Sequence, residues 1–427
     1  IVALPLSMAI AIASGATPDR GLYAAIVGGF LVSAFGGSRF QVGGPAGAFI
    51  VLVAATVERH GVEGLILATM ISGVILIAIG FLRIGAYIKF IPYPVTLGFT
   101  AGIALIIFVS QVTDLLGLKI DGREPAALVA KLSVLWPALP GANPSAILVS
   151  AVTVGGILAI KRWRPTWPGI LIAIACASFL AATGLGVETI GSRFGGIPHS
   201  LPAPALPQID MIRIAAVLPD AVAFALLGSI ESLLSAVVAD GMTGRRHRSN
   251  CELVAQGIAN VGSALFGGIC VTGTIARTAT NVRSGAHGPI SGMLHSLFLL
   301  GFMMLAAPLA SFIPLASLAG VLAVVAYNMI EKHAIAAIFR SSKGDLVVLA
   351  ATFLLTIFMG LTEGILVGFL IGVLLFIDRM SKSVAVEYQG PILARDVADD
   401  AIEDRQPYDP NTASDPDTVV YRISGAC

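Results

Sequence analysis

Apolar runs long enough for membrane helices follow one another along most of the chain, separated by short polar or glycine-rich breaks. An α-helix that spans a bilayer needs roughly 20 consecutive, mainly apolar residues. We therefore expect an all-α membrane protein with about fourteen transmembrane segments, about seven in each half of the chain. The predicted spans are 1–14, 21–35, 45–58, 64–82, 93–115, 145–160, 167–183, 215–239, 252–265, 272–284, 288–307, 315–330, 346–359 and 363–377.

The composition agrees with this pattern and excludes several classes of protein. Hydrophobic residues make up 56% of the 427 residues and charged residues only 12%, whereas soluble domains carry about 25% charged residues. The net charge of +1 gives no sign of nucleic-acid binding. The 4 cysteines lack metal-ligand spacing. No metalloprotease, P-loop or serine-hydrolase motif occurs, so we expect no enzyme activity, no metal and no cofactor.

The stretch 250–281 in the second half of the chain carries the most specific pattern. Its first part is expected to be a helix in which Glu252, Gln256 and Asn260 are spaced four apart. That spacing stacks three polar side chains on one helix face. The glycine pair 267–268 then ends the helix.

A second helix is predicted to follow this break after a short extended piece at 269–271. It begins near Thr272 and Thr274, whose hydroxyls can cap its first N–H groups. Arg277 lies about one turn inside this helix. A helix start with an arginine, surrounded by apolar sequence, is a ready site for an anion.

The first half of the chain repeats this arrangement. A glycine pair at 36–37 precedes an expected extended piece at 40–42, and a new helix starts with Pro45 near its first turn. Two interrupted segments at corresponding places in the two halves are the best sequence indication of an inverted repeat with a central binding site. We therefore expect short extended pieces before the interrupted third and tenth helices.

The motif of the second half resembles that of the sulfate permease (SulP) family of anion transporters, and the chain resembles a prokaryotic member. The residues that carry the resemblance are Asn250, 252–257, Ala259, Asn260, 267–268 and 277–281. It implies two inverted seven-span repeats. Spans one to four and eight to eleven would form a substrate-binding core, and spans five to seven and twelve to fourteen a gate. Alternating access would move the core against the gate.

The resemblance also implies where the substrate binds. In the family it lies between the two half-helix N-termini and the first and eighth helices. Carried over by position, the binding residues are Pro45, Ala46, Gly47, Thr274, Ile275, Ala276, Arg277, Leu6 and Ile10. Many relatives have glutamine at the position of Leu6 and serine at that of Ala276. The cavity is therefore less polar than usual, which favours a carboxylate over sulfate or bicarbonate.

One acidic residue lies deep within a predicted span, Glu231 of the eighth. A charge inside hydrocarbon is costly, so a functional role is the default hypothesis. We expect Glu231 to carry the coupling proton, with sodium as the competing coupling ion. The alternative is structural, because Glu231 and Arg277 could neutralise each other. Arg277 itself could contact the ligand, support the structure, or do both.

The end of the chain has a different composition from the rest. From position 382 on, acidic residues, proline and asparagine dominate the sequence. Residues 418–423 alternate between apolar and polar side chains as in one strand. We expect a transmembrane transport domain at 1–380. Residues 381–427 would form a cytoplasmic linker and the first strand of a truncated STAS domain. Because Ile1 starts within an apolar run without a methionine, an N-terminal segment is expected to precede it.

Basic loops predict the orientation of the chain. Clusters at 161–164, 245–248, 332–343 and 379–382 fall on one side under this span count. Basic loops favour the cytoplasmic side. We therefore expect a multi-pass protein of the cell (inner) membrane with a cytoplasmic C-terminus. The long loops 118–144 and 187–210 would lie outside.

The sequence thus predicts a secondary active transporter of small anions, with proton-coupled symport as the preferred mode. The alternatives are a nucleobase-type proton symporter of the same architecture and an uncoupled anion channel or exchanger. The expected partners are a small inorganic or organic anion and the lipid bilayer, but not nucleic acid. A homodimer is one option for the oligomeric state.

Overall fold

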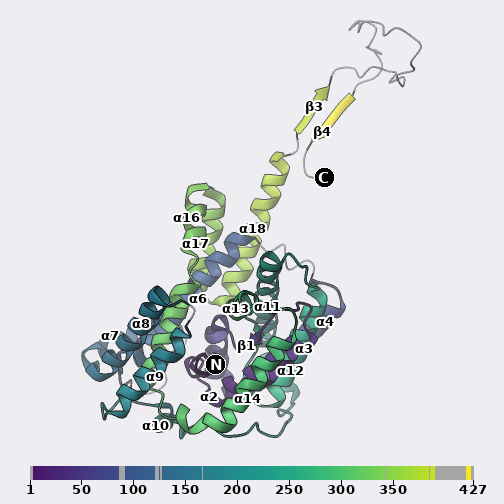
Figure 1. Cartoon of the computed structure of the whole chain (residues 1–427). Helices are drawn as coiled ribbons and strands as arrows, with labels where there is room; N and C mark the ends of the chain where they lie inside the picture. Colours follow the sequence, from purple (N-terminus) through teal and green to yellow (C-terminus); the bar gives the residue numbers. More distant parts are fainter. Residues whose placement is uncertain are drawn as a thin grey trace, which may run out of the picture. The chain divides into compact units, whose positions relative to one another are not determined.

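The computed structural model describes residues 3–85, 92–120, 125, 127–165, 167–341, 343–383, 385–389 and 420–424. The chain forms two compact units, Ile1–Gly368 and Phe369–Cys427. Helices dominate the first unit (Figure 1). In the first half of the chain they are α1 (Ala3–Ala13), α2 (Pro18–Tyr23), η1 (Ala24–Gly28), α3 (Gly29–Phe35), η2 (Gly47–Phe49), α4 (Ile50–Phe81), α6 (Tyr93–Leu116), α7 (Leu128–Ala138), η3 (Leu139–Gly141), α8 (Pro144–Trp163), α9 (Gly169–Ala182) and α10 (Ile190–Phe194).

The second half of the chain is also mainly helical. Its helices are α11 (Met211–Thr243), α12 (Ser249–Leu265), α13 (Ile275–Arg283), α14 (Ile290–Ala310), α15 (Leu315–Met329), α16 (Lys332–Ser341), α17 (Lys343–Phe358) and α18 (Leu361–Ser383). The described residues also form the strands β1 (Gly43–Gly44), β2 (Thr272–Gly273), β3 (Ala385–Gln389) and β4 (Val420–Ser424).

The predicted helical class is confirmed, and a helix occupies each predicted span. By length and composition, six helical stretches of the described chain can cross a membrane: Gly47–Phe81, Tyr93–Leu116, Pro144–Trp163, Met211–Thr243, Ile290–Ala310 and Leu315–Arg340. The predicted spans 45–58 and 64–82 form one continuous stretch with a kink at Gly61, where φ is 68° and ψ is −173°. Only glycine adopts such a conformation without strain. The number of membrane crossings stays a prediction.

Two segments that we expected to be loops contain helices. Residues 118–144 include α7, and residues 187–210 include the short α10. The prolines and glycines of both segments suggested irregular structure. In α7, however, Pro137 lies in the last turn, so the preceding leucine-rich sequence can still form a helix. Lys131 of α7 donates a hydrogen bond to Ser110 of α6 (2.9 Å), which ties the two helices together.

The contacts divide the helices of the first unit into two groups. The first group consists of η1, α3, α4, α11, α12, α13 and α14, which pack mainly on one another, and α2 joins this group through η1. In the second group α6 packs on α15 and α17, and α8 packs on α9 and α15. Helix α1 contacts both α2 and α15, so it lies between the groups, as Figure 1 shows. The division into a moving core and a gate stays a prediction.

The two short strands of the first unit join the two halves of the chain. Gly43 pairs with Gly273 and Gly44 with Thr272 in an antiparallel arrangement. The expected extended pieces before the third and tenth helices are therefore present, with the paired residues a little later than the ranges 40–42 and 269–271. Phe49, just after β1, packs edge to face on Phe224 of α11, with ring centroids 6.1 Å apart.

In the second unit, the predicted strand at 418–423 is observed as β4. It pairs along its whole length with β3, which the sequence analysis did not predict. The register pairs Ala385 with Ser424 and Gln389 with Val420. An isolated strand leaves its backbone groups unpaired, and β3 satisfies those groups on one edge of β4.

Candidate functional site

The strand pair β1–β2 brings two helix starts together from opposite halves of the chain. η2 and then α4 begin shortly after β1, and α13 begins directly after β2. The predicted binding residues of the third and tenth helices, Pro45 to Gly47 and Thr274 to Arg277, follow these two strands. A segment that begins a helix exposes N–H groups that the helix itself cannot satisfy.

Both helix starts lack a side-chain cap. Ala46 precedes η2 and has no side chain that can cap, and Thr274 precedes α13 without capping it. The Thr274 hydroxyl instead donates to the Val42 carbonyl (2.9 Å), and the Thr272 hydroxyl donates to the Gly228 carbonyl (3.1 Å). Our expectation that these hydroxyls cap the helix is therefore wrong. The N–H groups at both helix starts remain available to a ligand.

Arg277 lies between the two helix starts and helix α1. Its Nη2 donates to Ser7 Oγ (3.3 Å) and makes a long contact with the Pro45 carbonyl (3.5 Å). Its Nη1 is buried and has no hydrogen-bond partner among the described residues. Unpaired buried donors are rare in native proteins because each costs about 1–3 kcal/mol. The unpaired Nη1 therefore makes this position a candidate site for a ligand that accepts hydrogen bonds.

Gly44 makes room for this guanidinium. A Cβ atom at Gly44 would collide with Arg277 Nη1. Gly44 also has a φ of 153°, which side-chain-bearing residues rarely adopt. Both observations explain why β1 ends in glycine.

The remaining predicted binding residues differ in exposure. Ile10, Pro45 and Ala46 are buried, and Ala276 is exposed. The others are half-buried: Leu6, Gly47, Thr274, Ile275 and Arg277.

Sequence reasoning missed three neighbours of these residues. Fully buried Ser7 is the side chain of α1 that meets Arg277, although Leu6 and Ile10 were predicted. A Cβ atom at Gly47 would lie 3.6 Å from Met329 Sδ and 3.7 Å from Ile107 Cδ1, so the second helix group also reaches the site. A lone serine in an apolar helix was the available signal for Ser7. Ile107 and Met329 gave none.

Glu231 is half-buried on α11. One turn before it, Gly228 accepts the hydrogen bond from Thr272 of β2, and one turn after it, Ser235 donates to Thr278 of α13 (3.1 Å). Residues three and four apart share a helix face, so Glu231 lies on the face of α11 that meets β2 and α13. No salt bridge links Glu231 to Arg277, and mutual neutralisation is therefore not observed.

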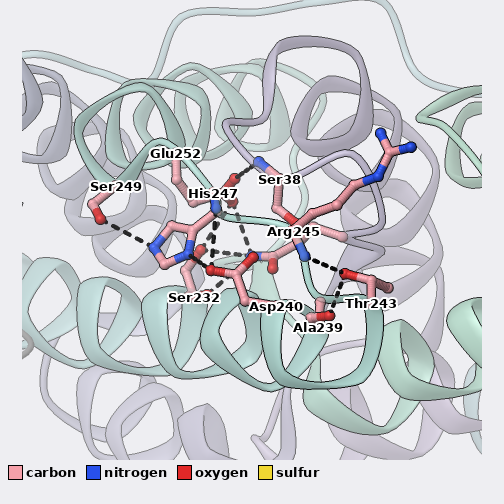
Figure 2. Close-up of polar contacts among 10 residues, drawn as sticks. Ser38, Ser232, Ala239, Asp240, Thr243, Arg245, His247, Ser249 and Glu252 are labelled. Carbon is pink, nitrogen blue, oxygen red and sulfur yellow. Dashed lines mark hydrogen bonds and ion pairs between the residues drawn. The ribbon is translucent and has the colours of Figure 1, made fainter.

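The polar face of α12 holds the segment that leads to β1. Glu252 is fully buried and accepts four hydrogen bonds, which Figure 2 shows in part. The donors are Ser38 N (3.0 Å), Gln41 Nε2 (2.9 Å), Ser232 Oγ (3.1 Å) and Gln256 Nε2 (3.0 Å). Hydrogen bonds to a charged group contribute about 1.5–3 kcal/mol each, so together they counter part of the cost of burying the carboxylate.

The same face of α12 also holds the segment that leads to β2. The Asn260 side chain accepts from Val271 N (2.9 Å) and donates to the Val271 carbonyl (2.9 Å), as a neighbouring strand would. The Ser263 hydroxyl donates to the Ile269 carbonyl (2.6 Å). The predicted stack of Glu252, Gln256 and Asn260 thus positions the segments that lead to β1 and β2, and these three side chains lie outside the set of predicted binding residues.

The loop between α11 and α12 is fixed by a second polar cluster, which Figure 2 also shows. Asp240 accepts from the backbone N–H of His247 (3.1 Å) and pairs with its ring Nδ1 (2.6 Å). The His247 Nε2 lies 3.0 Å from Ser249 Oγ, next to the start of α12. These contacts set the end of the loop and so the direction in which α12 leaves it.

Comparison with known proteins identifies relatives over most of the chain. The family model described as "Sulfate permease family" matches residues 1–352. A putative sulfate transporter, YvdB of Bacillus subtilis, is 41% identical over 399 residues, which cover 92% of this chain and 75% of that protein. The bicarbonate transporter BicA of Synechocystis is 34% identical over 389 residues, covering 89% of this chain and 68% of that protein.

Two solved structures share this fold. The transmembrane domain of a cyanobacterial bicarbonate transporter, BicA, superposes with a TM-score of 0.76 at 31% identity, over 87% of this chain and 94% of that one. The murine Solute Carrier 26 family member A9 anion transporter, in its inward-facing state, gives a TM-score of 0.81 at 18% identity, over 93% of this chain and 69% of that one. At that identity the second likeness concerns the fold alone.

Proposed function

The chain belongs to the sulfate permease family, and from the geometry around Arg277 we propose that it is a secondary active anion transporter driven by proton symport. Members of this family are multi-pass membrane transporters of small anions, and the chain is not an enzyme. The proposal concerns where the anion binds, which anion is preferred, and what drives its movement.

The unpartnered Nη1 of Arg277 carries the proposal. It lies at two helix starts whose first N–H groups lack side-chain caps. A helix N-terminus acts as roughly half a positive charge, so the two starts together act as about one. With the guanidinium, the site can balance one or two negative charges and still offer donors to several oxygen atoms.

The lining favours an oxyanion with an apolar part. Leu6 and Ala276 offer no polar atoms from their side chains, and Ser7 contributes one hydroxyl. Transporters named for sulfate and for bicarbonate are among the relatives. Two features of the site in this chain, the paired helix starts and Arg277, suit any small oxyanion. The apolar lining makes a carboxylate the preferred substrate.

Glu231 is the proposed coupling residue. It shares the face of α11 that meets β2 and α13 and has no ion pair with Arg277. An ionised Glu231 adds a second negative charge near the anion, whereas a protonated one does not. Anion and proton therefore favour each other's binding by the same factor. Uptake should accelerate as the pH on the uptake side falls.

Alternating access would expose the site to each side in turn. The site lies between the first helix group and residues Ile107 and Met329 of the second. A relative movement of the two groups would therefore open one side of the site and close the other. The exposed basic loop at 245–248 supports a cytoplasmic side for the end of α11, and with it a cytoplasmic C-terminus in the cell membrane.

Counterflow uptake into liposomes tests the proposed activity. The purified protein is reconstituted with unlabelled sulfate, bicarbonate or succinate inside, and labelled anion is added outside. A carrier gives transient accumulation that saturates with anion concentration. Flux that rises linearly with concentration would indicate a channel, and accumulation of nucleobases instead of anions would favour a nucleobase symporter.

Imposed gradients test the coupling. Wild-type protein should accumulate its anion in response to a pH gradient, acid outside, and not to a sodium gradient. Glu231→Gln should lose gradient-driven accumulation and keep anion exchange. A Glu231→Gln variant that still accumulates anion in response to the pH gradient would rule out Glu231 as the proton carrier. Accumulation by the wild type in response to a sodium gradient alone would show that sodium, and not the proton, is the coupling ion.

A further inference from the structure

Six exposed arginines lie at or just after the ends of α3, α4, α11 and α13, all in the first helix group. We call them the arginine rim: Arg39, Arg83, Arg245, Arg246, Arg248 and Arg283. Within the described chain, their guanidinium groups form no ion pair or hydrogen bond. Such a surface attracts polyanions unless nearby carboxylates neutralise it.

Contacts between the four segments bring the rim to one end of the helix group. The Arg248 N–H donates to the Gly37 carbonyl (3.2 Å), which joins the loop after α11 to the loop after α3. The Asn281 side chain of α13 donates to the Phe40 carbonyl (2.9 Å). A Cβ atom at Gly85, just after α4, would touch the start of α12. The six arginines therefore share one surface.

The carboxylates of these segments (36–42, 81–85, 240–252 and 281–289) are Asp240 and Glu252, and both already have partners. Asp240 pairs with the His247 ring (2.6 Å), and Glu252 is fully buried among its four donors. Figure 2 shows the Arg245 side chain extending away from this cluster. The rim thus keeps an excess of exposed positive charge.

Exposed apolar side chains lie beside the rim. Phe81 at the end of α4 is 74% exposed, and Leu82, directly before Arg83, is 70% exposed. Phe35 at the end of α3 and Met242 near the end of α11 are also exposed. Helices that cross a membrane stay apolar up to its surface, where basic side chains reach the headgroups. This combination fits a lipid surface better than a soluble polyanion.

We propose that the arginine rim binds the phosphate headgroups of anionic phospholipids and that this contact supports transport. The second part rests on the proposed transport function, whereas headgroup binding stands without it. A guanidinium can donate two parallel hydrogen bonds to one phosphate.

The rim is joined to the anion site through the backbone before β1. Arg39 directly follows Ser38, whose N–H donates to Glu252 (3.0 Å), and Arg248 holds the same segment through its own N–H. Headgroups bound to both arginines would restrain the segment that carries Gly44 to Arg277. Fixing this segment preorganises the site.

Thermal melting with defined lipids tests headgroup binding. Purified protein in a neutral detergent is titrated with phosphatidylglycerol, phosphatidylcholine or soluble glycerol phosphate. Phosphatidylglycerol should raise the melting temperature, and the other two should not. Arg39→Gln/Arg248→Gln should need more than tenfold as much phosphatidylglycerol for half of the rise, because each basic residue contributes about fivefold to binding at an anionic surface.

Arg162→Gln/Arg164→Gln is the matched control. Both residues are exposed at the end of α8, so this variant loses the same charge on the same expected side, but outside the rim. It should keep the wild-type response to phosphatidylglycerol. In liposomes, adding phosphatidylglycerol to phosphatidylcholine should accelerate counterflow severalfold for wild type and control, but not for the rim variant. Repulsion of the anion by a negative bilayer acts on all three proteins alike.

Several results would overturn the lipid site. Wild type without a response to phosphatidylglycerol would do so, as would equal responses of the rim variant and the control. An equal rise with glycerol phosphate would assign the rim to a soluble phosphate. Displacement of the lipid by polyglutamate, with a larger rise, would assign it to an acidic protein segment.

The transport part can fail separately. A lipid response in melting, with saturable counterflow that phosphatidylglycerol does not accelerate, would contradict the supporting role of the rim. Lipid binding by a protein without any saturable counterflow would instead refute the proposed transport function. The failures are therefore distinguishable.

Discussion

Glu252 and Arg277 are both charged residues inside the helix bundle, and they are embedded in opposite ways. Glu252 is fully buried and accepts four hydrogen bonds between 2.9 and 3.1 Å. Arg277 makes contacts of 3.3 and 3.5 Å and leaves Nη1 without a partner in the described chain. Removing a satisfied buried charge leaves its partners unpaired and costs stability, whereas an unsatisfied buried charge itself costs stability unless a ligand completes it.

The surroundings of Glu252 and of Arg277 are connected through the segment that leads to β1. Glu252 holds Ser38 and Gln41, which precede β1, and β1 carries Gly44 to Arg277. Rigid support on one side and free donors on the other are what a preorganised binding site needs. Glu252 therefore belongs to the residues that build the candidate site, and Arg277 to those that we propose bind the anion.

Removing the satisfied charge should have the largest effect on folding. Glu252→Ala leaves three buried donors, Ser38 N, Ser232 Oγ and Gln256 Nε2, without an acceptor, at about 1–3 kcal/mol each. We expect little monodisperse protein after detergent extraction, measured by size-exclusion chromatography and thermal melting. Glu252→Gln retains the shape and some hydrogen bonds and should be less affected. A Glu252→Ala protein that melts within a few degrees of wild type would contradict the structural role.

Removing the unsatisfied charge should affect transport more than folding. Arg277→Ala should raise the KM for the anion tenfold or more, because a charge-assisted hydrogen bond is worth about 1.5–3 kcal/mol. The melting temperature should stay close to that of wild type.

Arg20→Ala is the matched control for Arg277→Ala. The Arg20 guanidinium donates to the Gly267 carbonyl at 2.9 Å, so this variant should lose stability and keep its KM. A reversed result, with Arg277→Ala unstable and its affinity intact, would make Arg277 a structural residue.

Gly44→Ala should disturb the anion site without touching the anion. The added Cβ displaces Arg277 Nη1 and strains a backbone at φ 153°. A residue with a side chain at positive φ costs upwards of about 1 kcal/mol. We expect a loss of uptake in the same direction as Arg277→Ala, but smaller.

Gly61→Ala separates strain from displacement. Gly61 also has positive φ, but a Cβ there meets nothing within 4 Å. This variant should lose stability and keep its KM in the same uptake assay. Equal loss of uptake in both glycine variants would mean that strain, not the position of Arg277, is responsible.

The smallest effect concerns the apolar lining. Ala276→Ser adds one hydroxyl beside the start of α13, and a neutral hydrogen bond contributes about 0.5–1.5 kcal/mol. The KM for sulfate should therefore fall about threefold relative to the KM for succinate. A preference for succinate that increases in this variant would contradict the proposed role of the lining.

The sequence predicted much of the fold because long apolar runs have few alternatives to membrane helices. It also predicted both interrupted helices and the polar face of α12, since glycine pairs and the four-residue spacing are local signals. It did not predict β3, because a strand is stabilised by hydrogen bonds to its partner strand, and β3 and β4 are far apart in the sequence. It also did not predict α7, because Pro137 suggested a loop, whereas the structure places this proline in the last turn of the helix.

The site was predicted less completely for a physical reason. A hydroxyl near a helix start can cap that helix or bond elsewhere, and only the fold decides. The Thr274 hydroxyl turns to Val42 in the other half of the chain. Ser7, Ile107 and Met329 reach the site through packing between distant helices, which no local pattern records.

Anion-dependent thermal stabilisation of purified protein tests the role of Arg277 most directly. A ligand at 100 times its Kd stabilises the folded state by about 2.7 kcal/mol. The anion found by counterflow should therefore raise the melting temperature of wild type and of Arg20→Ala, and leave that of Arg277→Ala nearly unchanged at equal concentration. An Arg277→Ala protein that the anion stabilises as strongly as wild type would contradict the proposed binding site.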